Sequence, residues 1–152
     1  MSAEGRLSEL GLELPPVAAP VASYVPVVLA RGLAFVAGQV PLDEGKPMAT
    51  GRLGDDIETD QGATLARRCA LQALAALKAE LGSLDRVKRI AKVTVFVASA
   101  DTFTEQPKVA NGASDLLGDV FGEYGKHARA AVGVPVLPLG VPVEVELIAE
   151  VD

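Results

Sequence analysis

Apolar and polar positions alternate along this chain with two periods, one typical of helices and one typical of strands. The clearest helical segment is 59–81, where good helix formers dominate and apolar residues recur every three or four positions. Gly82 follows it as a plausible helix end. A second helical region covers 102–125. A short helix is expected within 6–14, because Pro15-Pro16 would stop it there.

Segments rich in β-branched residues predict five strands, at 24–30, 33–40, 89–99, 127–134 and 143–146. The segment 33–40 is nearly all apolar, so both of its faces are expected to be buried. The order β-β-α-β-α-β-β predicts an α+β fold over residues 1–152 as a single domain, with two helices packed on one face of a mixed sheet. Residues 1–16 form an N-terminal extension. The other sheet face is too apolar for solvent and is expected to pack against partner subunits.

The composition narrows the classes of function. The chain has 152 residues and a net charge of −6, which argues against nucleic-acid binding. No apolar run approaches the roughly 20 residues of a membrane span. A single cysteine, Cys69, excludes an internal disulfide. Together with an N-terminus unlike a secretory signal, it predicts a cytoplasmic protein. One histidine and no phosphate-binding motif predict an enzyme without a bound metal or cofactor.

The strongest chemical candidates lie near the C-terminus, where Arg129 stands on one predicted strand and Glu144 on the next. Arginine binds a small carboxylate through two parallel hydrogen bonds. A glutamate on the neighbouring strand is placed to orient a water beside that carboxylate. The sequence therefore suggests a small acid that is held and attacked by water. The alternatives are that Arg129 bridges subunits through a carboxylate, and that Glu144 and Glu146 simply point into solvent.

Three segments give the chain its resemblance to the RidA/YjgF family of reactive-intermediate deaminases, also labelled endoribonuclease L-PSP. The first combines Tyr24 with Ala37-Gly38-Gln39, and the second is 92–97 with the Asp101 and Phe103 that follow it. The strongest segment runs from Ala128-Arg129 to Glu146. The resemblance implies a chorismate-mutase-like fold, a homotrimer with sites between subunits, and no cofactor. It also implies hydrolysis of enamines and imines such as 2-aminoacrylate to 2-keto acids and ammonia.

The resemblance assigns a role to each matching position. Arg129 corresponds to the carboxylate-binding arginine, Glu144 to the glutamate that places the attacking water, and Tyr24 to the site tyrosine. Gly38 corresponds to a glycine that lines the pocket. Asn111 corresponds to a site asparagine, in an alignment that needs a gap in this region. The remaining candidate substrate-binding positions are Ala37, His127, Ala131 and Val132.

Three of these positions depart from the family pattern. Ala37 replaces a serine, Ala131 replaces a cysteine, and His127 stands where many relatives have proline or threonine. These departures predict a sister subfamily with a different substrate preference. His127 is either a substrate-contacting donor or acid, or a strand-end residue with no role. Tyr24 either contacts substrate or packs with its hydroxyl hydrogen-bonded.

Other functions stay open. A trimeric protein that binds keto acids without turnover is compatible with the alanine replacements. RNA cleavage, suggested by the older family label, is disfavoured by the acidic charge and by an aromatic content of 4%. Chorismate mutase activity is suggested only by analogy of fold.

Overall fold

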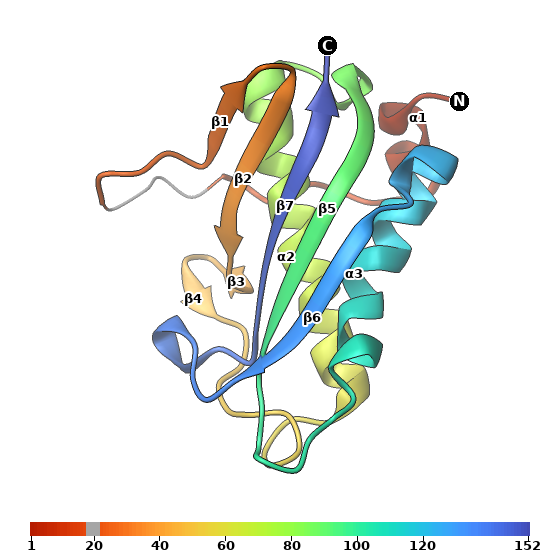
Figure 1. Cartoon of the computed structure of the whole chain (residues 1–152). Coiled ribbons are helices and arrows are strands. Elements are labelled where there is room, and N and C mark those ends of the chain that lie inside the picture. The colour runs from red at the N-terminus through yellow and green to blue at the C-terminus, as the bar shows by residue number, and fades with distance from the viewer. Residues whose placement is uncertain (18–21) are drawn as a thin grey trace.

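A five-stranded sheet organises the computed structural model, which describes residues 1–17 and 22–152 (Figure 1). Its strands, in spatial order, are β1 (Val27–Ala30), β2 (Leu33–Gln39), β7 (Val143–Val151), β5 (Val87–Ala98) and β6 (Ala128–Val134). Neighbours run antiparallel except β5 and β6, which are parallel. The mixed sheet is therefore confirmed, with β7 inserted between β2 and β5.

Two long helices cover one face of the sheet, behind it in the view of Figure 1. α2 (Thr59–Leu81) packs under β2 and β7 and has the predicted bounds. α3 (Gln106–Phe121) packs under β5 and β6 and is shorter than predicted, because Gly122–Gly125 form a separate 3-10 turn. The short helix α1 (Ala3–Glu9) packs against α3 and lies earlier than predicted.

Several short elements were not predicted from the sequence. They are the hairpin of β3 (Leu42–Asp43) and β4 (Lys46–Pro47), and the 3-10 turns Leu84–Arg86 and Pro138–Gly140. The hairpin lies within a segment rich in Gly, Pro and Asp, where two-residue strands leave no periodic signal. In the parts of the chain that the structure describes, no helix has both the length and the apolarity needed to span a membrane.

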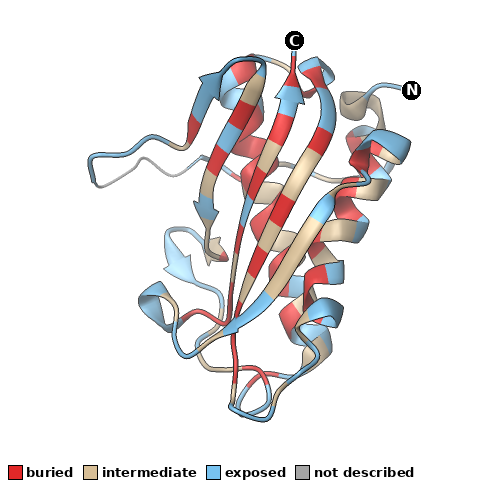
Figure 2. Cartoon of the chain, in the orientation of Figure 1, coloured by how far each residue is buried: buried red, intermediate tan, exposed pale blue. Residues whose placement is uncertain are grey.

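The core lies between the sheet and the helices. Along β7, every second side chain is buried against α2, beginning with Val143 and Val145, while Glu144 faces the other side (Figure 2). Leu74 and Cys69 of α2 are fully buried in the same core.

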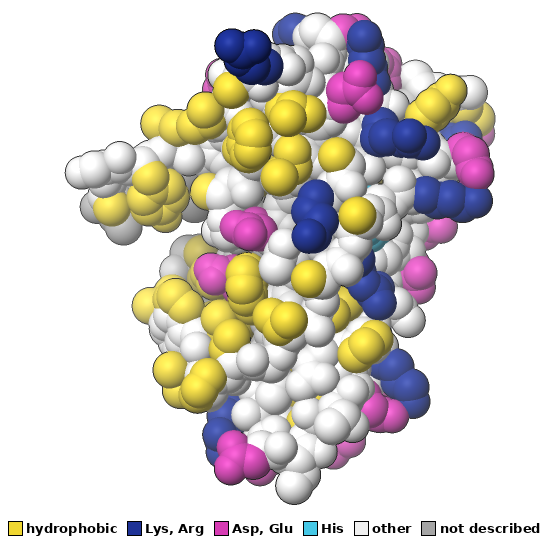
Figure 3. Space-filling model, in the orientation of Figure 1, with side chains coloured by type: hydrophobic (Ala, Val, Ile, Leu, Met, Phe, Trp, Pro, Cys, Tyr) yellow, Lys and Arg dark blue, Asp and Glu magenta, His cyan; other side chains and the backbone are white. Residues whose placement is uncertain are grey.

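The face of the sheet opposite the helices is called the open face below. The prediction that 33–40 is buried on both faces is wrong for the chain as it stands: Ala34 and Val36 are buried, but Phe35 is 41% exposed. The helices cover only one face, so residues alternate in burial along β2. Phe35 pairs with Val28 of β1, which is 50% exposed. Hydrophobic side chains gather over β1 and β2 on this face (Figure 3).

A bulge interrupts the pairing of β2 with β7. Val36 pairs with Leu147 and Gln39 pairs with Val145, so two residues of β2 face a single residue of β7. The Gln39 side chain secures the irregular backbone, since its Nε2 donates to the carbonyl oxygen of Ala37 at 3.0 Å. This bond ties Gln39 to the backbone of the bulge that shapes the site below.

Candidate functional site

Glu144 projects from β7 onto the open face and is partly buried there. It lies beside Gly38, the second residue of the β2 bulge. A Cβ atom at position 38 would stand 2.8 Å from Glu144 Oε1 and 3.1 Å from its Cδ. The missing side chain of Gly38 therefore provides the space that the carboxylate occupies.

The electrostatic surroundings of Glu144 favour proton uptake. Burial is the main reason that its pKa is raised above the ordinary glutamate value, and the negative charge of Glu146 adds to the effect. Glu146 itself is exposed, as expected for a residue pointing to solvent. Among the described residues, no donor hydrogen-bonds the Glu144 carboxylate. A partly buried carboxylate with a raised pKa is suited to act as a general base toward water.

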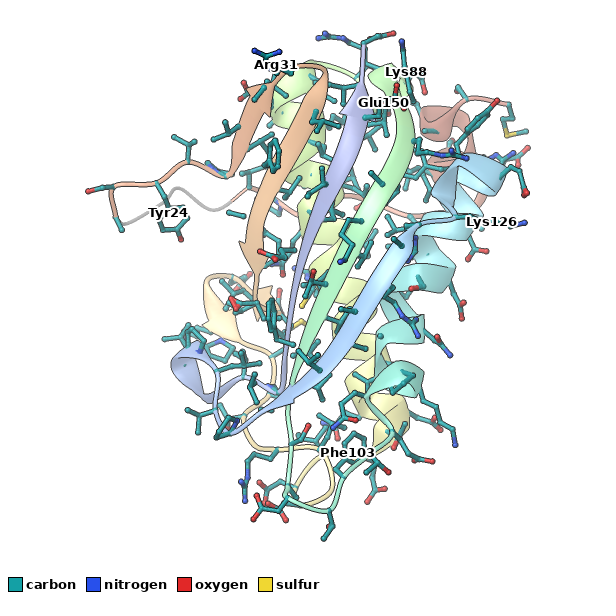
Figure 4. The ribbon with its side chains drawn as sticks, viewed as in Figure 1. Tyr24, Arg31, Lys88, Phe103, Lys126 and Glu150 are labelled. Atoms are coloured by element: carbon teal, nitrogen blue, oxygen red, sulfur yellow. The ribbon has the colours of Figure 1, made fainter. Side chains whose placement is uncertain are left out.

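A cavity of ≈ 510 Å³ opens beside this carboxylate and is lined in part by Gly38, Ala37, Tyr24 and Phe35. Tyr24 does not lie on a strand as predicted, because β1 begins only at Val27. The tyrosine lies instead on the segment leading into β1 and is 55% exposed (Figure 4). The sequence-predicted positions 24, 37, 38 and 144 thus share one cavity.

Arg129 belongs to a second cluster, at the sheet edge formed by β6. Its Nη1 donates to Asn111 Oδ1 at 2.8 Å and to Ser114 Oγ at 3.1 Å, both on α3. Asn111, which the resemblance gave as a site residue, therefore contacts Arg129. Ser114 was missed, although its position three residues after Asn111 places it on the same helix face. The two contacts orient one end of the guanidinium and leave its other N–H donors for a ligand.

His127 joins this second cluster through Ser114. The distance between Ser114 Oγ and His127 Nε2 is 2.9 Å, and His127 Nδ1 donates to the carbonyl oxygen of Gly125 at 2.6 Å. A carbonyl only accepts, so Nδ1 carries the proton. Gly125 packs closely on α3, where an added Cβ would lie 2.2 Å from the carbonyl oxygen of Leu117. Only glycine fits there, and it places the carbonyl that orients the histidine ring.

The two clusters do not meet within one chain. β5 lies between β6 and β7, so the prediction that Arg129 and Glu144 occupy neighbouring strands is wrong. The faces also differ: Arg129 pairs with Val93, which is buried under the helices, whereas Glu144 pairs with Phe96 on the open face. The cause is topological, because the chain leaving β6 passes over β5 and inserts β7 on its far side.

Ala131 and Val132, the last two predicted positions, belong to different clusters. Ala131 shares the face of Arg129 and packs against the core. Val132 points to the open face, is 43% exposed, and lies in one cross-strand row with Phe96 and Glu144. Val132 therefore belongs with the glutamate cluster.

The acidic loop before α2 has local roles. Asp55 accepts a hydrogen bond from Arg52 Nη2 at 2.7 Å, and Asp60 lies in the first turn of α2, where negative charge is favourable. Over residues 1–17 and 22–152, no group of three or more His, Cys, Asp or Glu side chains is arranged to hold a metal ion.

The sequence and the fold are similar to those of known proteins. The sequence profile described as "YjgF/chorismate mutase-like, putative endoribonuclease" matches residues 4–151. The chain belongs to this family. Protein TCP17 of Trypanosoma cruzi is 48% identical over 147 residues, which cover 96% of this chain and 92% of that protein.

Solved structures place the chain within the family. A Shewanella oneidensis protein described as a putative endoribonuclease is 38% identical, with a TM-score of 0.95 and coverage of 99% of this chain and 100% of that one. The YjgF gene product of E. coli is 26% identical, with a TM-score of 0.62 and coverage of 90% and 93%. The α+β fold and the family assignment are thus confirmed.

Proposed function

We propose that this protein hydrolyses small enamine or imine carboxylates to 2-keto acids and ammonia. The observation that carries the proposal is the Arg129 guanidinium, held at one end by α3 and open to a ligand at the other. Its fork matches a carboxylate, the one group that all such substrates share. Glu144 supplies the complementary base, partly buried and next to the space left by Gly38.

The active unit is a homotrimer, in which the β6 edge of one subunit meets the open face of the next. Two observations support this arrangement. The arginine and glutamate clusters lie on opposite faces of one sheet, so a single chain does not complete the site. The open face also carries exposed apolar side chains, including Val28 and Phe35, of the kind that subunit contacts bury. No nucleic acid or membrane takes part, and the single buried thiol suits a cytoplasmic protein.

The proposed reaction begins when Arg129 binds the substrate carboxylate. Glu144 accepts a proton from a water molecule, whose oxygen bonds to the carbon of the protonated imine (C=NH₂⁺) while the C=N π electrons move to nitrogen and give a neutral amine. Glu144 then protonates the nitrogen, the C–N bond breaks, and the hydroxyl proton leaves to solvent. Ammonia and the keto acid are released. Positioning supplies most of the acceleration, because imines also hydrolyse in water without a catalyst.

The first test compares Arg129→Ala and Arg129→Lys with wild type. The assay follows ammonia and keto-acid release from imines that are generated enzymatically from several amino acids. Losing two charge-assisted hydrogen bonds at about 1.5–3 kcal/mol each predicts a fall in kcat/KM of about 100-fold or more. Lysine is expected to restore little, because a point charge does not reproduce the fork. Arg52→Lys, in an exposed pair with Asp55, is the matched control. Full activity of Arg129→Lys would refute the bidentate contact.

The trimer is tested by mixing two inactive variants, Arg129→Ala and Glu144→Ala. After the subunits are dissociated and reassembled together, some sites receive their arginine from one variant and their glutamate from the other. Random mixing in a closed ring predicts that about one quarter of the sites are intact. No recovery of activity in verified mixed assemblies would show that the two residues act within one subunit.

A second candidate is a trimer that binds keto acids without turnover. The observation that favours it is the pair of alanines, Ala37 and Ala131, which remove a hydroxyl and a thiol that the family pattern has. Tight binding of 2-keto acids together with no acceleration of any imine would support this candidate over the deaminase. The endoribonuclease named for relatives is a third candidate, supported only if RNA cleavage copurifies with the protein and is lost in a site variant.

A further inference from the structure

Ser114 stands between the group that binds the substrate and a titratable ring. Its oxygen is 3.1 Å from Nη1 of Arg129 and 2.9 Å from Nε2 of His127. The far nitrogen of the ring is tied to the Gly125 carbonyl, so the ring keeps one orientation in both protonation states. The Gly125 carbonyl, the His127 ring and the Ser114 hydroxyl thus form a hydrogen-bonded series that ends next to the carboxylate-binding guanidinium.

We propose that Ser114 and His127 form a proton relay, which protonates the β-carbon of an enamine whose carboxylate is held by Arg129. The relay rests on the deaminase function proposed above and adds a step to it. The step converts the enamine to the imine that Glu144 and its water then hydrolyse. Ser114 contacts the substrate, and His127 acts through it as a positioning residue and proton source.

The direction of the hydroxyl follows from counting donors and acceptors. When His127 is cationic, its Nε2–H donates to one lone pair of Ser114 Oγ, and Arg129 Nη1 donates to the other. The O–H of Ser114 is then directed away from both and toward a ligand on the guanidinium. When His127 is neutral, the O–H turns to donate to Nε2. The two protonation states of one ring therefore switch the serine between proton donor to the ligand and donor to histidine.

The step balances in atoms and charge. The Ser114 proton moves to the terminal CH₂ of a 2-aminoacrylate-like enamine, where the C=C π pair forms the new C–H bond. The nitrogen lone pair forms C=N, which gives the iminium carboxylate. The Nε2 proton of His127 simultaneously replaces the proton lost by Ser114. The anionic enamine becomes a net neutral zwitterion, and the imidazolium becomes neutral imidazole.

The surroundings of the relay suit an anionic ligand. The adjoining cavity of ≈ 290 Å³ is lined by Ser114, His127, Arg129 and Lys126, with Gly118 and Gly125. No carboxylate belongs to this lining, although Lys126 Nζ contacts Glu123 at 2.7 Å. Lys126 lies where the chain enters β6 (Figure 4). The two cationic side chains attract the substrate, and the volume accommodates a three-carbon acid.

Two substrates of matched size isolate the proposed step. A β-eliminating enzyme acting on serine generates 2-aminoacrylate, which needs protonation at carbon. An amino-acid oxidase acting on alanine generates 2-iminopropanoate, which has already gained that proton. Ser114→Ala and His127→Gln are expected to slow acceleration of 2-aminoacrylate hydrolysis by about 10-fold or more. Any loss on 2-iminopropanoate, which reports the disturbed contact with Arg129, should be about 10-fold smaller than the loss on 2-aminoacrylate, and urea unfolding verifies that both variants fold.

Chemical rescue separates proton transfer from structural support. In His127→Gly, added imidazole is expected to restore the 2-aminoacrylate rate and to leave the 2-iminopropanoate rate unchanged. Lys126→Gln, which alters the charge of the same cavity without touching the relay, is the control, and it should change the rates on both substrates by the same factor because both carry the carboxylate. Equal losses on both substrates, or no imidazole rescue, would overturn the relay while the deaminase function stands. Absence of acceleration by wild type on both substrates would instead overturn the deaminase function itself.

Discussion

Gly38→Ala adds a single methyl group at the bulge of β2, next to the glutamate of the site. The new Cβ would lie 2.8 Å from Glu144 Oε1, whereas ordinary van der Waals contact begins near 3.4 Å. The carboxylate must therefore retreat by about 0.6 Å. The backbone does not resist the change, because Gly38 does not have a positive φ. The perturbation is thus confined to the position of one carboxylate.

The expected effects on stability and on rate differ in size. Glu144 is partly buried at the end of a flexible side chain, so its displacement costs less than the 1–3 kcal/mol typical of overpacking a core, roughly 1 kcal/mol or below. Replacing glycine also gains about 0.4–1 kcal/mol from the unfolded chain, which offsets much of this cost. The rate is more sensitive, because a misplacement of about 1 Å costs about 100-fold. We expect a fall in kcat of roughly 10- to 100-fold at nearly unchanged stability.

Imine hydrolysis by ammonia release gives the rate, and urea unfolding gives the stability. Gly5→Ala is the control, since its methyl group would contact only the flexible side chains of Met1 and Ser2, far from the site. In a Glu144→Ala background, Gly38→Ala should have no further effect on rate. A wild-type rate in the Gly38→Ala single variant would refute the reasoning, because the carboxylate would then not need its observed position.

Three further predictions concern stability and reactivity. Leu74→Ala, in the fully buried stripe of α2, should lower the free energy of unfolding by about 2–5 kcal/mol, measured by urea titration. Cys69 is fully buried and its pKa is raised, so thiol reagents should label it only as fast as the protein opens; rapid labelling in native buffer would contradict its place in the core. The pKa of Glu144 is raised in the folded state, so this residue stabilises the fold below its unfolded pKa and loses that contribution as pH rises through the folded pKa. Glu144→Gln should therefore gain stability relative to wild type as the pH rises from the unfolded glutamate pKa of about 4.3 through the folded pKa, and a constant difference over that rise would contradict the shift.

The sequence predicted the helices and strands more accurately than it predicted which strands lie next to each other in the sheet. The long apolar stripe of α2 fixed both of its ends, since helical periodicity is a local signal. The adjacency of β6 and β7 was wrong, because strand order depends on where a connection crosses the sheet and no local pattern encodes it. Arg129 and Glu144 remain the proposed chemical pair, but they were predicted on neighbouring strands. Their separation became visible only once the faces of both strands were known.

The same distinction explains why Ser114 was missed while His127 was predicted. The two residues are 13 positions apart, on a helix and before an edge strand, so no motif spacing joins them. The cavity around Tyr24 and Gly38 was anticipated from the resemblance alone, whereas the bulge that forms it has no signature in hydrophobic pattern.

The bulge in β2 makes chain length as important as residue identity for this half of the site. Beyond it, side chains of β2 point to the opposite face from the one that strict alternation would give, which is why Gln39 pairs with buried Val145. Deleting Ala37 would restore regular pairing with Gln39 still opposite Val145, and would remove the extra residue that brings Gly38 beside Glu144, with Glu144 itself unaltered. In an alignment of relatives, a one-residue gap at this place would mark proteins that retain both charged residues yet have lost the pocket. Insertions and deletions at this place therefore distinguish relatives by function, whereas substitutions of single residues do not.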